Sequence, residues 1–198
     1  MNKSRFLPLL AYGFVFLSAC TNANDNQIET TQKNNYPVDS YPSEIQKLLD
    51  DWEEQCFEQK YDTETEETIT FKDGFLTQVD VTGDGINDYI VDINKAKCAY
   101  SASFWGNYPP FHVYQASQDN NAIEIYSNGS FIIEDEPKHP RVVSNNDGYF
   151  DIQYVGSGDT CGQTGEYSFA GMESCEVTLR WNKTTLEMEQ VDTRKFNF

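Results

Sequence analysis

Apolar positions in this chain recur first at helical spacing and then at every second residue. In YPSEIQKLLDDWEEQCFEQK, residues 41–60, apolar side chains follow one another at intervals of three and four, with acidic side chains between them. Ser43 and Gln46 fit a capping box at the start of this segment. The pattern predicts an amphipathic helix whose buried side includes Trp52 and Cys56.

From about residue 67 the spacing changes to period two, which is typical of half-buried strands. Turn signals such as Lys72-Asp73-Gly74, Asn128-Gly129 and Asn146-Asp147-Gly148 separate the apolar runs. We therefore expect an α+β fold in which the N-terminal helix packs on a mainly antiparallel β meander, held by disulfide bonds. The expected strands are 68–71, 75–81, 88–93, 111–115, 122–126, 131–133, 141–143, 149–155, 175–182 and 185–191.

The N-terminal segment MNKSRFLPLLAYGFVFLSAC predicts export. Lys3 and Arg5 precede an apolar run of about 14 residues, which is too short for a bilayer that requires about 20. Leu17-Ser18-Ala19-Cys20 resembles the lipobox of bacterial lipoproteins. That resemblance implies cleavage before Cys20 and attachment of diacylglycerol and a fatty acid such as palmitate to it. An ordinary cleaved signal with a chance cysteine is the alternative.

Thr21, rather than Asp, follows this cysteine, which among such lipoproteins implies sorting to the inner leaflet of the outer membrane, facing the periplasm. We expect residues 1–19 to be the signal peptide. Residues 20–40 are polar with almost no large apolar side chains, so we expect a flexible tether. Residues 41–198 are long enough to form a single domain with its own core.

Four further cysteines, Cys56, Cys98, Cys161 and Cys175, follow the predicted signal. In an oxidising compartment an even number of cysteines indicates disulfides, and three pairings can be drawn. We favour Cys161–Cys175, because the short segment between them looks like a hairpin excursion. That choice leaves Cys56–Cys98, which would tie the buried side of the helix to the end of a strand.

The chain is strongly acidic, with 14 Lys and Arg against 32 Asp and Glu and a formal net charge of −18. Such a surface repels nucleic acids and anionic lipid headgroups, and it favours cations or basic protein partners. Acidity is also a common means of keeping a protein soluble. The charge therefore argues against nucleic-acid binding and leaves a basic partner as a hypothesis.

The stretch DVTGDGINDYIVDI, residues 80–93, has the spacing of a calcium-binding loop. Side chains at positions 1, 3, 5 and 9 of a tight loop, with the carbonyl at position 7, converge on one point. Here these ligands would be Asp80, Thr82, Asp84, Asp88 and the carbonyl of Ile86. A calcium ion would neutralise the clustered carboxylates, and we expect its role to be structural. The alternative is an acidic glycine turn that holds no ion.

The loop is not an EF-hand, because position 12 is Val91 where an EF-hand requires a bidentate Glu, and the flanking residues alternate like strands. It resembles the strand–loop–strand element of FG-GAP-like and VCBS-like extracellular proteins. The wider pattern of DVTGDGINDYIVDINKAKCAYSAS and GDTCGQTG followed by SCEVTLRWN resembles small exported bacterial proteins of unassigned function. This resemblance implies a compact, disulfide-bonded, mainly β domain.

A second stretch, NNDGYFDIQY at 145–154, aligns loosely with TGDGINDYIV at 82–91. It keeps Asn145, Asp147, Gly148 and Asp151, but it has Val143 where the first copy has Asp80. A degenerate metal site and an Asp-Gly hairpin turn both account for these residues.

The aromatic segment AYSASFWGNYPPFHVY, residues 99–114, is a candidate for partner binding. Tyr100, Phe104, Trp105 and Tyr108, together with two prolines, would form a rigid amphipathic surface of the kind that anchors interfaces. The alternative is that these rings cap the β core.

The sequence contains no nucleophile elbow and no phosphate-binding loop, and its carboxylates are too numerous to single out a glycosidase pair. We therefore predict a non-catalytic periplasmic lipoprotein that acts as a binding or inhibitor module, such as an immunity protein against a cell-envelope toxin. One alternative is a calcium-dependent scaffold or adhesion module. The other is an envelope hydrolase with an unrecognised carboxylate site.

Overall fold

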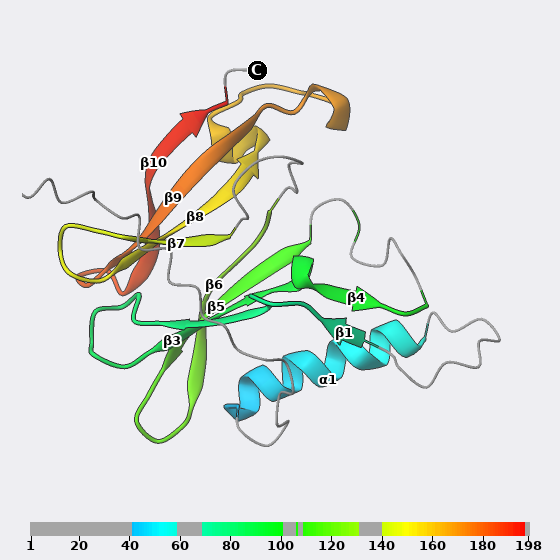
Figure 1. Cartoon of the computed structure of the whole chain (residues 1–198). Helices are drawn as coiled ribbons and strands as arrows, with labels where there is room; N and C mark the ends of the chain where they lie inside the picture. The colour runs from blue at the N-terminus through cyan, green and yellow to red at the C-terminus, as the bar shows by residue number, and fades with distance from the viewer. Residues whose placement is uncertain (1–40, 59–68, 101–105, 107–108, 131–139, 197–198) are drawn as a thin grey trace, which may run out of the picture. The chain divides into compact units, whose positions relative to one another are not determined.

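Ten antiparallel strands in three sheets form most of the structure (Figure 1), a computed structural model that describes residues 41–58, 69–100, 106, 109–130 and 140–196. The described residues all belong to one compact unit, 31–198. The elements are α1 (Ser43–Phe57), β1 (Ile69–Phe71), β2 (Leu76–Val79), β3 (Asp88–Asp92), η2 (Ile93–Lys95), β4 (Ala96–Cys98), β5 (Pro110–Ala116), β6 (Ala122–Gly129), β7 (Arg141–Ser144), β8 (Phe150–Ser157), η3 (Gly158–Cys161), η4 (Phe169–Gly171), β9 (Ser174–Asn182) and β10 (Glu187–Lys195).

Each of the two larger sheets is built from a continuous stretch of the chain. The first sheet has the order β2-β3-β5-β6, and the second sheet has the order β10-β9-β8-β7. A two-stranded ribbon pairs β1 with β4. Figure 1 shows the first sheet in green and the second in yellow to red. Neighbouring strands in both large sheets are therefore joined by hairpins or by local excursions.

The first sheet is buried on both faces because successive side chains in a strand point to opposite sides. Ile90 and Val113 pack with residues of the second sheet, including Val177, in one apolar cluster. Val91 lies in another cluster with Trp52 of α1. The first sheet thus packs against the second sheet on one face and against α1 on the other.

Helix α1 confirms the amphipathic helix predicted from the sequence, with Ile45, Trp52 and Cys56 buried. The predicted capping box is wrong. Pro42 is the N-cap and its carbonyl accepts hydrogen bonds from the backbone N–H of residues 45 and 46, so Ser43 is already inside the helix. The amide of Gln46 instead donates to Asp50, one turn further on, at 2.7 Å.

The predicted α+β class is wrong, because the structure is mostly β with one short helix. The predicted single meander is in fact two four-stranded meanders and a ribbon. Nine predicted strands overlap observed ones, β4 was not predicted, and the predicted strand 131–133 lies outside the described residues. Turn signals locate strand ends, but they do not reveal that the chain leaves one sheet between β6 and β7. None of the described helices is long and apolar enough to span a membrane.

Candidate functional site

The acidic loop connects β2 to β3, so both of its ends are fixed by a hydrogen-bonded hairpin in which Val79 pairs with Asp88. Gly83 and Gly85 have positive φ angles of 69° and 90°, which residues with a Cβ atom rarely adopt. The glycines in the motif are therefore required by the path of the backbone. The five predicted calcium ligands all lie in this loop or at its C-terminal end.

Asp80 accepts hydrogen bonds from three backbone N–H groups of the loop. Its Oδ1 lies 2.6 Å from the nitrogen of Gly83 and 3.2 Å from that of Asp84, and its Oδ2 lies 2.9 Å from that of Gly85. Asp84 in turn accepts from the backbone N–H of Ile86 at 2.8 Å. Both side chains are thus held by the loop's own backbone.

Asp88 is fully buried and joins three segments of the first sheet. Its Oδ2 accepts from the backbone N–H groups of Val81 and Thr82 at 3.0 Å each. Its Oδ1 accepts from the backbone N–H of Ala116, at the end of β5, at 3.1 Å. Burial raises the pKa of Asp88 above its ordinary value, although these donors act in the opposite direction. Asp88 therefore clamps the loop to β5.

Together, seven backbone N–H groups point at these three carboxylates. Such donors favour the charged form of a carboxylate and offset the repulsion between neighbouring acids. Among the described residues, no group of three or more His, Cys, Asp or Glu side chains is arranged to hold a metal ion. Sequence spacing predicted that the carboxylates would converge, but it carried no signal for this competing backbone network.

Thr82 and Ile86 complete the predicted ligand set. Thr82 is 2 % exposed, and its Oγ1 forms no hydrogen bond of normal geometry with a described residue, although it lies close enough to lower the pKa of Asp88. Ile86 is partly buried, and its backbone N–H is taken by Asp84. The calcium site therefore stays a prediction.

The second, similar stretch also lies in the first hairpin of its sheet, between β7 and β8. Asp151 takes the position that Asp88 has in the first stretch, but the two acids lie on opposite faces of their sheets. Asp88 is two residues from Ile90 and therefore shares its inward face, whereas Asp151 is next to the inward-facing Ile152 and therefore lies on the outer face. Asp151 is 4 % exposed, and both of its oxygens accept from the guanidinium of Arg180, at 2.9 and 2.7 Å. These contacts favour the hairpin-turn interpretation.

Burial raises the pKa of Asp151, but the hydrogen bonds and charge of Arg180 outweigh this effect, so that the pKa lies below its ordinary value. A similar arrangement lies further along the same outer face, where Arg141 and Arg194 both donate to the buried Glu176, at 2.8 and 2.7 Å. Three arginines therefore form ion pairs with buried carboxylates of the same sheet.

Both favoured disulfides are confirmed. Cys56 and Cys98 are joined across 42 residues, and Cys161 and Cys175 across 14. The first bond links α1 to the ribbon, and the second closes the excursion between β8 and β9. Cys20, the predicted lipidation site, lies outside the described residues.

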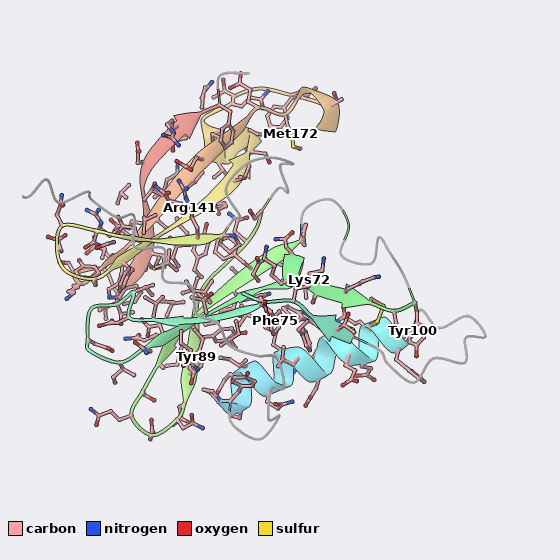
Figure 2. The ribbon with its side chains drawn as sticks, viewed as in Figure 1. Lys72, Phe75, Tyr89, Tyr100, Arg141 and Met172 are labelled. Carbon is pink, nitrogen blue, oxygen red and sulfur yellow. A yellow bond between two sulfur atoms is a disulfide. The ribbon has the colours of Figure 1, made fainter. Side chains whose placement is uncertain are left out.

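The C-terminal end of α1 carries an exposed aromatic side chain among acids. Phe57 is 55 % exposed, and its ring lies 6.4 Å from that of Tyr100 in an edge-to-face arrangement. Figure 2 shows Tyr100 beside the end of α1. Exposed Glu53, Glu54 and Glu58 surround Phe57 along the helix. We call these five residues the helix-end patch.

The patch includes only Tyr100 of the four partner-binding candidates, because Phe104, Trp105 and Tyr108 lie outside the described residues. The sequence did not predict that Phe57 would be exposed, because its spacing from the other apolar residues places it on the apolar side of the helix. Phe57 is the last residue of α1, and the disulfide between the preceding Cys56 and Cys98 ties this end of the helix to β4.

Comparison of the chain with protein-family models, with curated proteins and with solved structures finds no match. The resemblances of the N-terminal segment and of the acidic loop therefore remain predictions from the residues themselves.

Proposed function

We propose that the chain is a non-catalytic, lipid-anchored binding module of the bacterial envelope that inhibits a basic exported protein, as an immunity protein does with a cell-envelope toxin. The observation that carries this proposal is the helix-end patch, which combines the exposed ring of Phe57 and the half-buried ring of Tyr100 with exposed acidic side chains. Aromatic side chains supply most of the binding energy in many interfaces, and complementary charge steers the partner to them.

The charge of the chain supports a basic partner. Lys47 is the one basic residue of α1, and it already pairs with Asp51 at 2.5 Å. Glu53, Glu54 and Glu58 are three of the 32 acidic residues that give the chain its net charge of −18. A basic protein would be attracted to this negative charge as it approaches the patch.

A covalent cross-link joins the two segments that form the patch. The Cys56–Cys98 disulfide connects the residue before Phe57 to the residue two positions before Tyr100. A patch that is already ordered loses less conformational entropy when it binds, which raises affinity. A lipid tether at Cys20 would hold such a module at the membrane where an envelope toxin acts.

A sibling-competition assay tests this function and does not require the toxin to be identified. A strain that lacks the gene is grown with the wild-type strain, and we expect it to be outcompeted unless it is complemented with the wild-type chain. Complementation with Phe57→Ala or Glu54→Lys should fail at normal expression, because loss of an aromatic anchor costs about 2 kcal/mol, or about thirtyfold in affinity.

The matched control variants make the same kinds of substitution, loss of an exposed apolar side chain and reversal of an exposed charge, outside the helix-end patch. Leu186→Ala removes an apolar side chain that is 66 % exposed, and Glu187→Lys reverses one exposed charge on β10. Both should complement fully. Equal competition by the deletion strain would refute the immunity function, and complementation by both patch variants would refute the patch as its binding surface.

The acidic loop supports a second candidate function, that of a calcium-dependent scaffold or adhesion module. The specific observation is the buried Thr82 hydroxyl, an oxygen without a normal hydrogen bond to a described residue, in the loop whose sequence also carries Asp80 and Asp84. Calcium would supply a divalent charge that these oxygens bind. Extracellular loops of this kind bind calcium with dissociation constants of roughly 10⁻⁴–10⁻³ M.

At that affinity, about 10 mM calcium stabilises the folded state by about 1.4–2.7 kcal/mol, which raises Tm by several degrees. Asp84→Ala should abolish this gain, whereas Asp147→Ala, in the similar turn of the second sheet, should keep it. A wild-type domain whose Tm is the same in calcium and in chelator would refute calcium binding.

A further inference from the structure

A long excursion of the chain separates β8 from β9, and the Cys161–Cys175 disulfide closes it at its base. The turn between β7 and β8 needs only residues 145–149, whereas this connection takes residues 158–173. None of the described side chains between the two cysteines is buried, so this part of the excursion adds nothing to the core. We call residues 162–173 the braced loop, and Figure 1 shows it at the end of the second sheet, between β8 and β9.

One side chain braces this loop from inside. The amide of Gln163 donates from Nε2 to the carbonyl oxygen of Gly171 at 2.8 Å, and its Oε1 accepts from the backbone N–H of Glu173 at 2.9 Å. The backbone N–H of Gln163 donates to the carbonyl oxygen of Gly158 at 3.1 Å. Gln163 therefore links the beginning of the loop to its end and fixes the distance between them.

A second set of contacts fixes the loop to the turn at its base. Tyr167 donates from its hydroxyl to Asp159 at 2.6 Å. A Cβ on Gly158 would overlap this hydroxyl, and Gly158 has a φ of 56°, so the contact requires glycine at this position. The backbone N–H of Gly158 also donates to the carbonyl oxygen of Glu173 at 2.9 Å. The loop is thus ordered although it is exposed.

The composition of the braced loop is typical of binding loops. Its sequence, GQTGEYSFAGME, is rich in Gly and includes Tyr and Ser, which antibody loops favour because they supply contact area and hydrogen bonds at a low cost in conformational entropy. A loop that is ordered before binding also loses less entropy when it binds. The loop contains two acidic residues, Glu166 and Glu173, and no basic one, so its charge complements a basic surface.

We propose that the braced loop is the inhibitory element of the chain and that it enters a positively charged cleft of the basic exported protein. The inference rests on the proposed immunity function and specifies which part of the chain blocks the partner. The shape of the loop supports a cleft, because both of its limbs are exposed and a flat surface would contact only its tip. Clefts are also where proteins bind their small ligands and substrates, so a loop that fills one excludes them.

The test uses the sibling-competition assay, with each variant of the full chain expressed from an inducible promoter in the deletion strain. Ala170→Trp adds a large side chain at an exposed position of the loop, and Thr184→Trp adds the same side chain at the exposed turn between β9 and β10. We expect Ala170→Trp to fail to complement and Thr184→Trp to complement fully, because the core of an interface is packed as closely as a protein interior. Both purified variants should keep the urea midpoint of the wild type, since both positions are exposed.

Two further variants test the brace and the charge. Gln163→Ala removes both side-chain hydrogen bonds of the brace but leaves the exposed positions unchanged. We expect it to lower the affinity about tenfold, so that about tenfold higher expression restores complementation. Gln153→Ala is the matched control, since the amide of Gln153 also forms two hydrogen bonds, and it should complement at normal expression. Glu166→Lys should fail to complement, unlike the Glu187→Lys control.

The other results contradict different statements. If Ala170→Trp, Gln163→Ala and Glu166→Lys all complement at normal expression, the loop is not the inhibitory element, and the immunity function stands. If Thr184→Trp fails as Ala170→Trp does, the effect is not specific to the loop and the inference is refuted. If Ala170→Trp has a lowered urea midpoint, Gln163→Ala decides alone, and its complementation at normal expression refutes the inference. If the deletion strain competes equally, the immunity function fails and the inference fails with it.

Discussion

Replacing Asp88 by Asn tests whether this carboxylate is a clamp or a metal ligand. Asp88 accepts from three buried backbone N–H groups and uses both oxygens to do so, Oδ2 for Val81 and Thr82 and Oδ1 for Ala116. Asn has one oxygen and one NH₂ group. In either orientation, its NH₂ therefore faces at least one backbone donor.

The better orientation keeps the oxygen toward Val81 and Thr82 and leaves the N–H of Ala116 without an acceptor. A buried donor left without a partner costs about 1–3 kcal/mol. The two remaining bonds also lose the strength that a charged acceptor gives them, whereas removal of a buried charge recovers part of the loss. We expect Asp88→Asn to lower the free energy of unfolding by about 2 kcal/mol, or Tm by about 4–8 °C for a domain of this size.

Urea unfolding in the presence of a chelator measures this loss in the absence of any divalent ion. Asp84→Asn is the matched control, since its remaining oxygen still accepts from the N–H of Ile86, and it should change stability by less than about 0.5 kcal/mol. If Asp88→Asn is as stable as the wild type in chelator but loses a calcium-dependent stabilisation, Asp88 is a ligand and the clamp is refuted.

Three further predictions concern other buried groups. Burial raises the pKa of Asp92 to about 6, so its contribution to stability falls by about 2 kcal/mol as pH rises from about 4 to 6, and Asp92→Asn should remove that slope from unfolding curves measured at several pH values. Replacing Cys56 and Cys98 together by Ser should lower the free energy of unfolding by about 4 kcal/mol in the chain-entropy model; urea midpoints unchanged from the wild type would contradict that loop entropy. Arg180→Ala leaves the buried Asp151 without its ion pair and should cost about 2 kcal/mol at pH 7. The loss should be smaller at pH 3, because below the ordinary pKa of Asp the carboxylate of the unfolded chain takes up a proton, which offsets part of what the ion pair contributes; equal losses at both pH values would argue against the pair.

Local patterns in the sequence predicted the elements of this fold better than their arrangement. The period-two alternation located β5 and β9 to within one residue, because each has a buried face and an exposed or polar one. The three residues of β4 are too few to show a period. The assignment of strands to two sheets depends on which apolar faces meet, and side chains such as Val113 and Val177 look alike in either arrangement.

The candidate site shows the same division. The spacing of Asp80 and Asp84 predicted a tight glycine loop, and the positive φ angles of Gly83 and Gly85 agree with it. The spacing could not predict which backbone N–H groups would donate hydrogen bonds to the carboxylates, because nearly every residue type carries the same backbone N–H group. The hydrogen bond from Lys183 to the carbonyl of Gly83 could not be predicted either, because 100 residues separate the two.

The strand pairing has a consequence for how the chain acquires its structure. Among the residues that the structure describes, every hydrogen-bonded strand pair of the two large sheets lies within 76–129 or within 141–195, and no ladder joins the two stretches. Contacts between residues close in sequence form faster than distant ones, because less loop-closure entropy is lost. The N-terminal sheet can therefore complete its ladders before the C-terminal strands emerge from a ribosome or a translocation channel, and the later sheet then docks onto a surface that is already formed.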